Sequence, residues 1–415
     1  MRESRNTEFK ETVSNTFLKT VSAFANYGTG EIYFGITDEG TEIGIHDPVK
    51  VCLDIENRIN DSLNPVPEYR LEIDNATSVI KLTVKEGPHK PYLYKSKAYR
   101  RNDSATIEVD RLDLTRLILD GQDTSYEELA TKEEGLTFNT LEQKLKEKLL
   151  LTDFSEDTLK TLELDKPGQG LNIAGELLAD KNSFPGIDLM RFGDSISIIL
   201  DRETFENESL LLQYDQAIET YRKYYQYEQI RGAIRNTVSL IPEEAFRESI
   251  ANALVHRAWD VKAPINVAMF SDRIEITSPG GLPKGISKED YFKGGLSLLR
   301  NRIIATVFLR LGMIERFGTG IRRIIESYQN SERKPIFDIS DSSIRISLPV
   351  ILQKNDLSDD ENKVYEFIKG RTVASSTIVE MTGFGKNKVV KILKKLVEDG
   401  YIHTTGSGRG LKYTT

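Results

Sequence analysis

The chain has 415 residues, of which 39% are hydrophobic and 29% charged, so its length predicts two to four domains and its composition is typical of globular proteins. Cys52 is the only cysteine, which excludes a disulfide framework and a cysteine-based zinc site and favours a cytoplasmic location. No apolar run is long enough to span a bilayer, and the charged first residues do not resemble a secretory signal, so we expect no membrane contact. The net charge is −8, but residues 381–415 hold seven Lys and Arg against two Asp and Glu. That segment therefore carries +5 and the other 380 residues carry −13, which concentrates positive charge at the C-terminal end.

The first 120 residues combine one predicted helix with several predicted strands. Residues 12–26 repeat apolar side chains at helical spacing. Segments rich in β-branched and aromatic residues then predict strands at 31–38, 69–74, 79–86 and 97–103. We expect a compact α+β domain over residues 1–120.

The middle of the chain predicts a connecting region and a second large domain. Residues 121–206 contain charged helices, a turn cluster, a further helix and a strand at 196–201. A polar and aromatic helix is predicted over 207–230, and from Glu243 the pattern becomes helix, strand, glycine-rich loop and helix. We assign a domain to 207–350, followed by a short linker. The predicted fold class of the whole chain is α+β multidomain.

Residues 357–415 predict three short helices and a β-hairpin with a basic tip. Lys388, Lys391 and Lys395 share the face of the third helix that lies opposite its apolar stripe. These elements resemble a winged helix-turn-helix domain, and the resemblance places the lysine face in a major groove and Arg409 at a phosphate. The alternative is a solvated lysine face, or a winged helix that contacts another protein.

A set of polar and glycine motifs lies within the domain at 207–350. Glu248, Asn252 and His256 are four residues apart, so on a helix they share one face. Two glycine motifs follow, made of Gly280, Gly281, Gly318, Thr319 and Gly320. The three motifs in this order resemble the GHKL-type ATPase-like domain of RecG-related regulators.

This resemblance implies an α/β sandwich that binds ATP. Glu248 would activate water and Asn252 would ligate a magnesium ion, roles that suit a carboxylate and an amide oxygen. The glycines would let backbone N–H groups approach phosphates. The chain departs from the family at the adenine-binding Asp, where Ser278 stands, so the domain is either a working nucleotide site or a degenerate one retained for dimerisation. No P-loop motif is present, which argues against a helicase motor of the usual kind.

Three blocks near the N-terminus carry a sharper resemblance. They are E-x(4)-EFK at 3–10, AFANYGTGEIYFGITDEGTEIGI at 23–45 and KAYRRNDSAT at 97–106. In this order they resemble the Schlafen AlbA-like domain, once called a divergent AAA domain. The segment LNIAGELLADKNSFPGIDLMRF resembles the connecting part of the RecG-related bacterial members.

In nuclease-active Schlafen proteins, three acids bind a divalent metal and cut RNA, including tRNA. Carried onto this chain, the resemblance assigns Glu3, Glu8 and Asp38 as ligands of Mg²⁺ or Mn²⁺, with Lys10 beside them to stabilise charge. The residues also allow an alternative in which Glu8 and Lys10 pair on a strand, Glu3 is solvated and Asp38 is a turn residue.

Tyr99, Arg100, Arg101 and Ser104 fit an aromatic, basic and polar block of the same family. The resemblance implies that these residues contact phosphate and stack on a base. Asp103 belongs to a pair that stands where the family usually has a glycine.

Two functions of different class follow from these patterns. The first is a metal-dependent endoribonuclease that acts on RNA or tRNA in stress or phage defence, with a weak or degenerate GHKL-type ATPase domain. The second is a non-catalytic DNA-binding transcriptional regulator with an ATP-binding-like domain. For both we expect a nucleic-acid partner and a homo-oligomer, either a dimer or larger.

Overall fold

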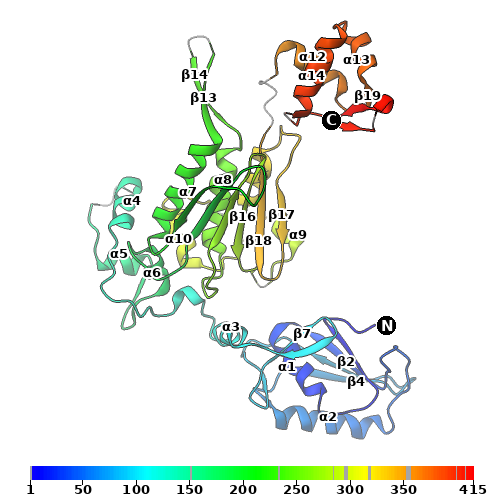
Figure 1. Ribbon diagram of the computed structural model, residues 1–415. Helices are drawn as coiled ribbons and strands as arrows, with labels where there is room; N and C mark the ends of the chain where they lie inside the picture. Colours follow the sequence, from blue (N-terminus) through cyan, green and yellow to red (C-terminus); the bar gives the residue numbers. More distant parts are fainter. Residues whose placement is uncertain are drawn as a thin grey trace.

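The computed structural model describes residues 2–149, 152–231, 234–283, 285–293, 298–315, 319–351, 357–398, 400–406 and 408–415. Its helices and strands form an N-terminal, a central and a C-terminal part, which Figure 1 shows in blue, green to orange, and red. The α+β multidomain class predicted from the sequence is confirmed. Within the described ranges, no helix combines the length and the apolar character needed to cross a membrane.

The N-terminal part is built on a four-stranded sheet with the strand order β1-β2-β5-β4. Strand β1 runs parallel to β2, and the other neighbours are antiparallel. The elements are β1 (Thr7–Lys10), α1 (Phe17–Tyr27), β2 (Gly30–Phe34), α2 (Pro48–Ser62), β3 (Leu63–Asn64), β4 (Tyr69–Ile73), β5 (Ile80–Val84), β6 (Leu93–Tyr94), β7 (Tyr99–Asn102), β8 (Ala105–Glu108) and α3 (Arg111–Gly121). Each helix and strand predicted in this region is present.

Helix α1 forms the core of this part together with the sheet. Phe17, Val21 and Phe24 recur at helical spacing and are fully or almost fully buried. Phe17 meets Phe34 of β2 edge to face, with 5.3 Å between ring centroids. Burying these aromatic side chains is the main force that holds α1 on the sheet.

A segment of short elements follows the N-terminal part. It contains a 3-10 helix (Tyr126–Glu128), α4 (Asn139–Leu149), α5 (Glu156–Thr161), β9 (Asp165–Lys166), β10 (Gly170–Leu171) and α6 (Ile173–Leu178). Leu141, Leu177 and other buried side chains of this segment belong to the same hydrophobic cluster as the central sheet. The predicted connecting region therefore packs onto the central part and shares its core.

The central part contains a six-stranded sheet with the order β12-β11-β15-β16-β18-β17. Its elements are β11 (Ile187–Phe192), β12 (Ile199–Phe205), α7 (Leu210–Tyr225), β13 (Gln226–Arg231), β14 (Ile234–Ser239), α8 (Glu243–His256), β15 (Ile265–Met269), β16 (Arg273–Pro279), α9 (Lys288–Lys293), α10 (Arg302–Arg310), α11 (Gly320–Ser327), β17 (Ile336–Ile339) and β18 (Ser343–Pro349). Strands β11 and β15 are parallel, and every other neighbouring pair is antiparallel.

Two features of the central part differ from the sequence prediction. The sheet begins at Ile187, inside the predicted connecting region, because β11 pairs with β15 of the central part. The helix predicted over 207–230 ends at Tyr225, and Gln226 begins a hairpin of β13 and β14 that projects from the central part in Figure 1. Both differences depend on pairing with strands that lie later in the chain, which local patterns do not reveal.

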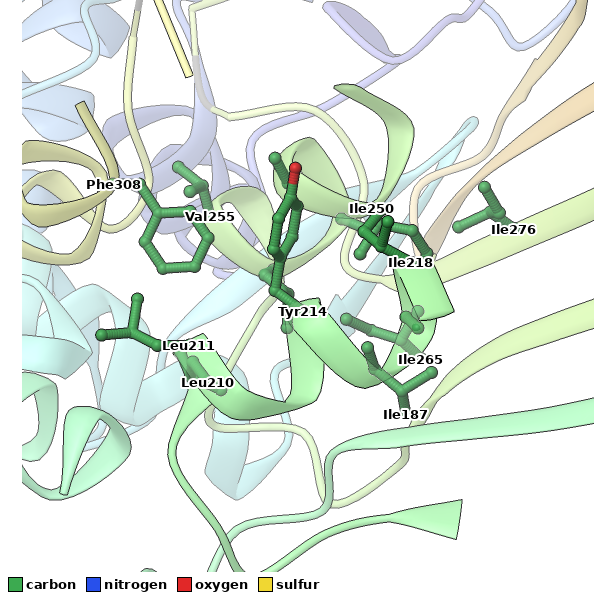
Figure 2. Packing of buried hydrophobic residues seen from close by; sticks show 14 of the residues in the cluster. Ile187, Leu210, Leu211, Tyr214, Ile218, Ile250, Val255, Ile265, Ile276 and Phe308 are labelled. Carbon is green, nitrogen blue, oxygen red and sulfur yellow. The ribbon is translucent and has the colours of Figure 1, made fainter. Parts of the chain in front are cut away.

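Helices α7, α8 and α10 share one core with this sheet. Figure 2 shows Tyr214 of α7 beside Phe308 of α10, and their ring centroids lie 6.3 Å apart in an edge-to-face contact. Ile250 of α8 and Ile265 of β15 are fully buried in the same core. Burial of apolar side chains along α8 thus fixes the direction in which its polar residues point.

The C-terminal part contains three helices and a small sheet, with the strand order β19-β21-β20. The elements are α12 (Asp359–Ile368), β19 (Val373–Ala374), α13 (Ser375–Thr382), α14 (Lys386–Glu398), β20 (His403–Thr405), a 3-10 helix (Gly408–Gly410) and β21 (Lys412–Thr414). The three helices and the hairpin predicted here are present. Val364, Ile378, Val389 and Leu393 are fully buried and join the helices in one core.

Candidate functional site

Glu8, the second acid of the expected metal triad, lies on β1 and is paired with two cations. Its carboxylate lies 2.5 Å from Lys10 Nζ and accepts a further hydrogen bond from Arg101 Nη1. Glu8 and Arg101 are each only 7% exposed. Arg101 also donates to Thr106 Oγ1 at 2.9 Å and to the Ser4 carbonyl at 3.1 Å. Glu8 and Lys10 therefore pair on a strand, as one part of the alternative predicts, and a buried guanidinium joins the pair.

The two other acids of the expected triad have different surroundings. Glu3 Oε1 accepts a hydrogen bond from the backbone N–H of Phe9 at 2.9 Å, and Asp38 is exposed on the turn that follows β2. Across the described ranges, no three Asp, Glu, His or Cys side chains are placed to hold a metal ion. A divalent cation at Glu8 would also have to displace two cations that already neutralise it. Among the described residues the three acids are not brought together as a metal site, and the Mg²⁺ or Mn²⁺ site of Glu3, Glu8 and Asp38 stays a prediction.

The aromatic and basic block near residue 100 makes several contacts within the protein, and its nucleic-acid-binding role stays a prediction. Tyr99 is 7% exposed and its ring belongs to the core, which leaves no ring face for a base to stack on. The Arg100 guanidinium pairs with Asp113 at 2.9 Å. Ser104 is exposed in the turn between β7 and β8, where Asp103 adopts the positive φ of 54° that a glycine would take easily.

Glu248, Asn252 and His256 follow one another along α8, as their spacing predicts. Asn252 Nδ2 donates to Glu248 Oε1 at 3.1 Å, and burial raises the pKa of Glu248. Gly320, the first residue of α11, packs so closely that a Cβ on it would clash with Glu248 Oε1. The neighbouring Thr319 Oγ1 is buried without a hydrogen-bond partner among the described residues. The third residue of this glycine motif, at position 318, lies outside the described residues.

A cavity opens beside this motif, between α8, the sheet and the start of α11. Ile276, Ile344 and Ile346 of the sheet line one side, and Tyr291 and Leu298 also face it. The cavity has a volume of about 80 Å³, which is small beside the range of about 300–1,000 Å³ found for small-molecule pockets. The described residues thus form a largely apolar pocket at the place where the sequence predicts a nucleotide site.

Glycines at the end of β16 shape the rim of the cavity. Gly280 has φ +102°, and a Cβ on it would lie 2.8 Å from Ala258 Cβ. A Cβ on Gly281 would lie 2.6 Å from the Ser340 carbonyl oxygen. Both predicted glycines are therefore required by close packing of the chain around the cavity.

His256 and Ser278 are polar residues of the cavity lining. Ser278 stands where the family resemblance places an adenine-binding Asp. The Ser278 hydroxyl donates to the Ala253 carbonyl at 3.0 Å, so its hydrogen is used within the protein. His256 lines the cavity, and its Nδ1 is buried without a hydrogen-bond partner in the described part of the chain. Burial and the nearby charge of Arg300 lower the pKa of His256 to about 4, so its imidazole is neutral at physiological pH.

The predicted lysines of α14, Lys388, Lys391 and Lys395, are all exposed, and two of them also pair with acids. Lys388 pairs with Asp360 of α12 at 2.6 Å, and Lys395 pairs with Glu361 at 2.9 Å. The outer stripe of the helix is made of Lys386, Asn387, Val390, Lys391 and Lys394, all exposed. Lys388 and Lys395 are exposed beside this stripe, and the side chain of Arg409 lies outside the described residues.

Sequence reasoning missed a group of polar residues just before and within α10. Arg300 Nη2 donates to the Gly281 carbonyl at 2.6 Å. Asn301 Nδ2 donates to the Val255 and Arg257 carbonyls, at 2.7 and 2.8 Å, and so closes the end of α8. Asparagine directly before an apolar helix is a known start signal, but its partners here belong to another helix. Only the tertiary structure shows that this segment joins α8 to the rim of the cavity.

Among the described residues, polar contacts join the three parts of the chain. Arg116 of α3 forms a two-pronged pair with Asp260 of the central part, at 2.6 and 3.0 Å. Tyr365 of α12 donates to Glu332, in the turn after α11, at 2.8 Å. These side chains link the cavity-bearing part to both ends of the molecule.

Two domain families match the chain. Residues 3–110 match the family described as Schlafen, AlbA_2, and residues 262–348 match the family described as Putative ATP-dependent DNA helicase recG C-terminal. The second match begins after α8, so Glu248, Asn252 and His256 lie outside it. No curated protein matches the chain.

The solved structures that are similar to the chain include the following two. One is the DIP2311 protein from Corynebacterium diphtheriae, 19% identical over 99% of this chain and 92% of its own, with a TM-score of 0.47. The other is the N-terminal domain of a putative ATP-dependent DNA helicase RecG-related protein from Nitrosomonas europaea, 29% identical over 27% of this chain and 85% of its own, with a TM-score of 0.21.

Proposed function

We propose that this chain, which carries a Schlafen AlbA_2 domain and a domain like the C-terminal part of RecG-type proteins, is a non-catalytic regulator that binds duplex DNA through its C-terminal part. Both families indicate a nucleic-acid-related function. The C-terminal part, as a winged helix-turn-helix, would place α14 in the major groove, which is wide enough for a helix.

The exposed stripe of α14 is the observation that carries this proposal. One side of the helix is anchored by Val389, Leu393 and Leu396, which are fully buried. The opposite stripe presents Asn387 and Lys391, with two further lysines beside them. Lysines can neutralise phosphates and an asparagine side chain can read the edge of adenine, so the stripe combines general affinity with base recognition.

A metal-dependent endoribonuclease, the other function suggested by the sequence, has less support. Its acids are used within the N-terminal part, since Glu8 is held by Lys10 and Arg101 and Glu3 by a backbone N–H. We therefore expect no divalent-metal-dependent cleavage of RNA by this chain. Cleavage that Glu8→Gln abolished while the domain stayed folded would contradict this view.

Fluorescence anisotropy with labelled DNA duplexes at several salt concentrations tests the proposal. The double change of Lys391→Ala with Lys394→Ala should weaken binding by about tenfold or more and lower the slope of log affinity against log salt by about two. Lys146→Ala is a matched control, because it removes an exposed helical lysine of α4 that pairs with Glu142. Equal affinity of the double variant and the wild type would overturn the proposal, and so would tighter binding to double-stranded RNA, whose major groove is too narrow for a helix.

ATP binding and self-association remain predictions. A GHKL-type site would use Asn252 to hold a magnesium ion and the glycines near α11 to approach phosphates, and the close approach of Gly320 to α8 is compatible with that role. Size-exclusion chromatography with light scattering would measure the expected dimer or larger oligomer.

A further inference from the structure

Val390 is an exposed apolar residue in the outer stripe of α14. Val389, Leu393 and Leu396 of the same helix are fully buried in the core of the C-terminal part. Val390 is 49% exposed. Valine is also a weaker helix former than lysine, because its branched side chain loses freedom in a helix. Neither burial nor helix formation therefore explains a valine at this position.

Val390 lies in the first turns of α14, on the same side of the helix as an exposed asparagine. Asn387 precedes it by three residues and Lys394 follows it by four, and both are exposed. Side chains at this spacing are neighbours, with about 5–6 Å between their Cβ atoms. Helix-turn-helix proteins contact base edges with the N-terminal residues of the helix that enters the major groove. An amide and a branched apolar group thus stand side by side at the end of α14 that would meet base edges.

The major groove presents chemical groups that match these two side chains. The amide of an asparagine forms two hydrogen bonds with N6 and N7 of adenine, and apolar side chains pack against the C5 methyl group of thymine. Successive bases of one strand lie about 3.4 Å apart along the duplex axis, so side chains 5–6 Å apart reach bases that are one or two pairs apart. The lysines of the same stripe would contact phosphates, which carry no sequence information directly.

We propose that Val390 determines sequence specificity by packing against the C5 methyl group of a thymine, one or two base pairs from an adenine that Asn387 reads. This inference rests on the proposed function, because it requires α14 to enter the major groove of a DNA duplex. The preferred site of the chain therefore contains an A·T pair with a thymine next to it or one pair further on. Lys391 and Lys394 supply affinity that all sequences share.

Selection of a pool of random-sequence DNA duplexes with the full chain tests whether such a site exists. The selected duplexes should share an adenine and a thymine at the predicted spacing, and should bind about tenfold or more tightly than the unselected pool. Salt-dependent binding with no shared sequence would overturn this inference and leave the proposed function standing. If no duplex bound at all, the proposed function itself would fail, and this inference with it.

Replacement of thymine by uracil in the selected duplex isolates the contact with Val390, because the two bases differ only in the C5 methyl group. Uracil at the contacted thymine should weaken binding of the wild type by about fourfold, the effect of one buried methyl group. Val390→Ala should bind the thymine and uracil duplexes equally, and Val390→Ile, which keeps a branched side chain, should still prefer thymine. A thymine preference that was unchanged in Val390→Ala would contradict the assignment.

Three further variants separate the contact of Val390 from general effects on binding. Val49→Ala, at a valine of α2 that is 72% exposed, is the matched control and should leave the thymine preference unchanged. Asn387→Ala should lose the preference for adenine and keep that for thymine. Lys391→Ala should weaken binding of the thymine and uracil duplexes by the same factor, because a phosphate contact does not distinguish them. If Lys391→Ala removed the thymine preference instead, Val390 would not be the residue that reads the methyl group.

Discussion

Two charged regions of this molecule, the β1 strand at one end and the α14 helix at the other, illustrate how burial decides the role of a charge. At β1, Glu8 and Arg101 are almost fully buried and neutralise each other. At α14, Lys391 stays in water, while Lys388 is tied to an acid of α12. Both regions carry charges that suggest nucleic-acid chemistry. The charges of β1 serve the fold, and the outer lysines of α14 remain available to a partner.

Arg101→Met gives the largest effect that this comparison predicts. The change leaves the buried Glu8 carboxylate with Lys10 alone, and unpairing a buried charge costs about 3–5 kcal/mol. Hydrogen exchange of the full chain should show this loss of protection in β1 and β2. The double variant Glu8→Gln with Arg101→Met should lose less stability than Arg101→Met alone, because no uncompensated buried charge remains. If Arg101→Met lowered the stability measured by hydrogen exchange by less than about 1 kcal/mol, the Glu8–Arg101 pair would not be important for the fold.

Glu127 extends the comparison to a buried acid held by backbone groups. Its carboxylate accepts hydrogen bonds from the N–H groups of Ile303 and Ile304, at 2.7 and 3.1 Å, at the start of α10. Burial nevertheless raises the pKa of Glu127 from its ordinary 4.5 to about 7. The folded chain therefore binds this proton more tightly than the unfolded chain, so the stability it adds is complete below pH 4.5 and is lost as the pH rises to 7.

Urea unfolding followed by Trp259 fluorescence at pH 5 and pH 8 measures the Glu127 effect. From pH 5 to pH 8 the free energy of unfolding of the wild type should fall by up to about 3 kcal/mol more than that of Glu127→Gln, in which this side chain cannot titrate. At pH 5 the two proteins should be similar, because a protonated Glu and a Gln have nearly the same shape and charge. Parallel pH profiles of the two proteins would contradict the assignment.

We expect the smallest effect from Arg70→Ala, which removes an exposed ion pair and so contrasts with the buried pair at β1. Arg70 pairs with Glu72 on β4 at 2.9 Å, but its side chain is 76% exposed. Exposed pairs of this kind contribute less than about 0.5 kcal/mol, because water screens them and long side chains lose freedom when they pair. The same hydrogen-exchange measurement should show β4 unchanged within that limit. A loss comparable to that of Arg101→Met would mean that burial does not separate the two pairs.

Local sequence patterns determined much of the architecture. Apolar spacing places α1, α8 and α14, because a helix must bury one stripe whatever it packs against. The spacing of Glu248, Asn252 and His256 correctly predicts one helix face. Such local patterns do not show which distant strands pair. The sequence therefore did not predict that β11 and β12 belong to the central sheet.

The roles of the candidate residues were decided by tertiary structure. The sequence alone determined that acids, lysines and glycines occur in motifs that resemble metal, DNA-binding and nucleotide sites. Only the folded chain brings Arg101 onto Glu8 and Asp360 onto Lys388, and leaves His256 in a cavity without a partner. The physical reason is that a charge acts through its surroundings: burial and partners more than ninety residues away set whether it binds a ligand or holds the fold together.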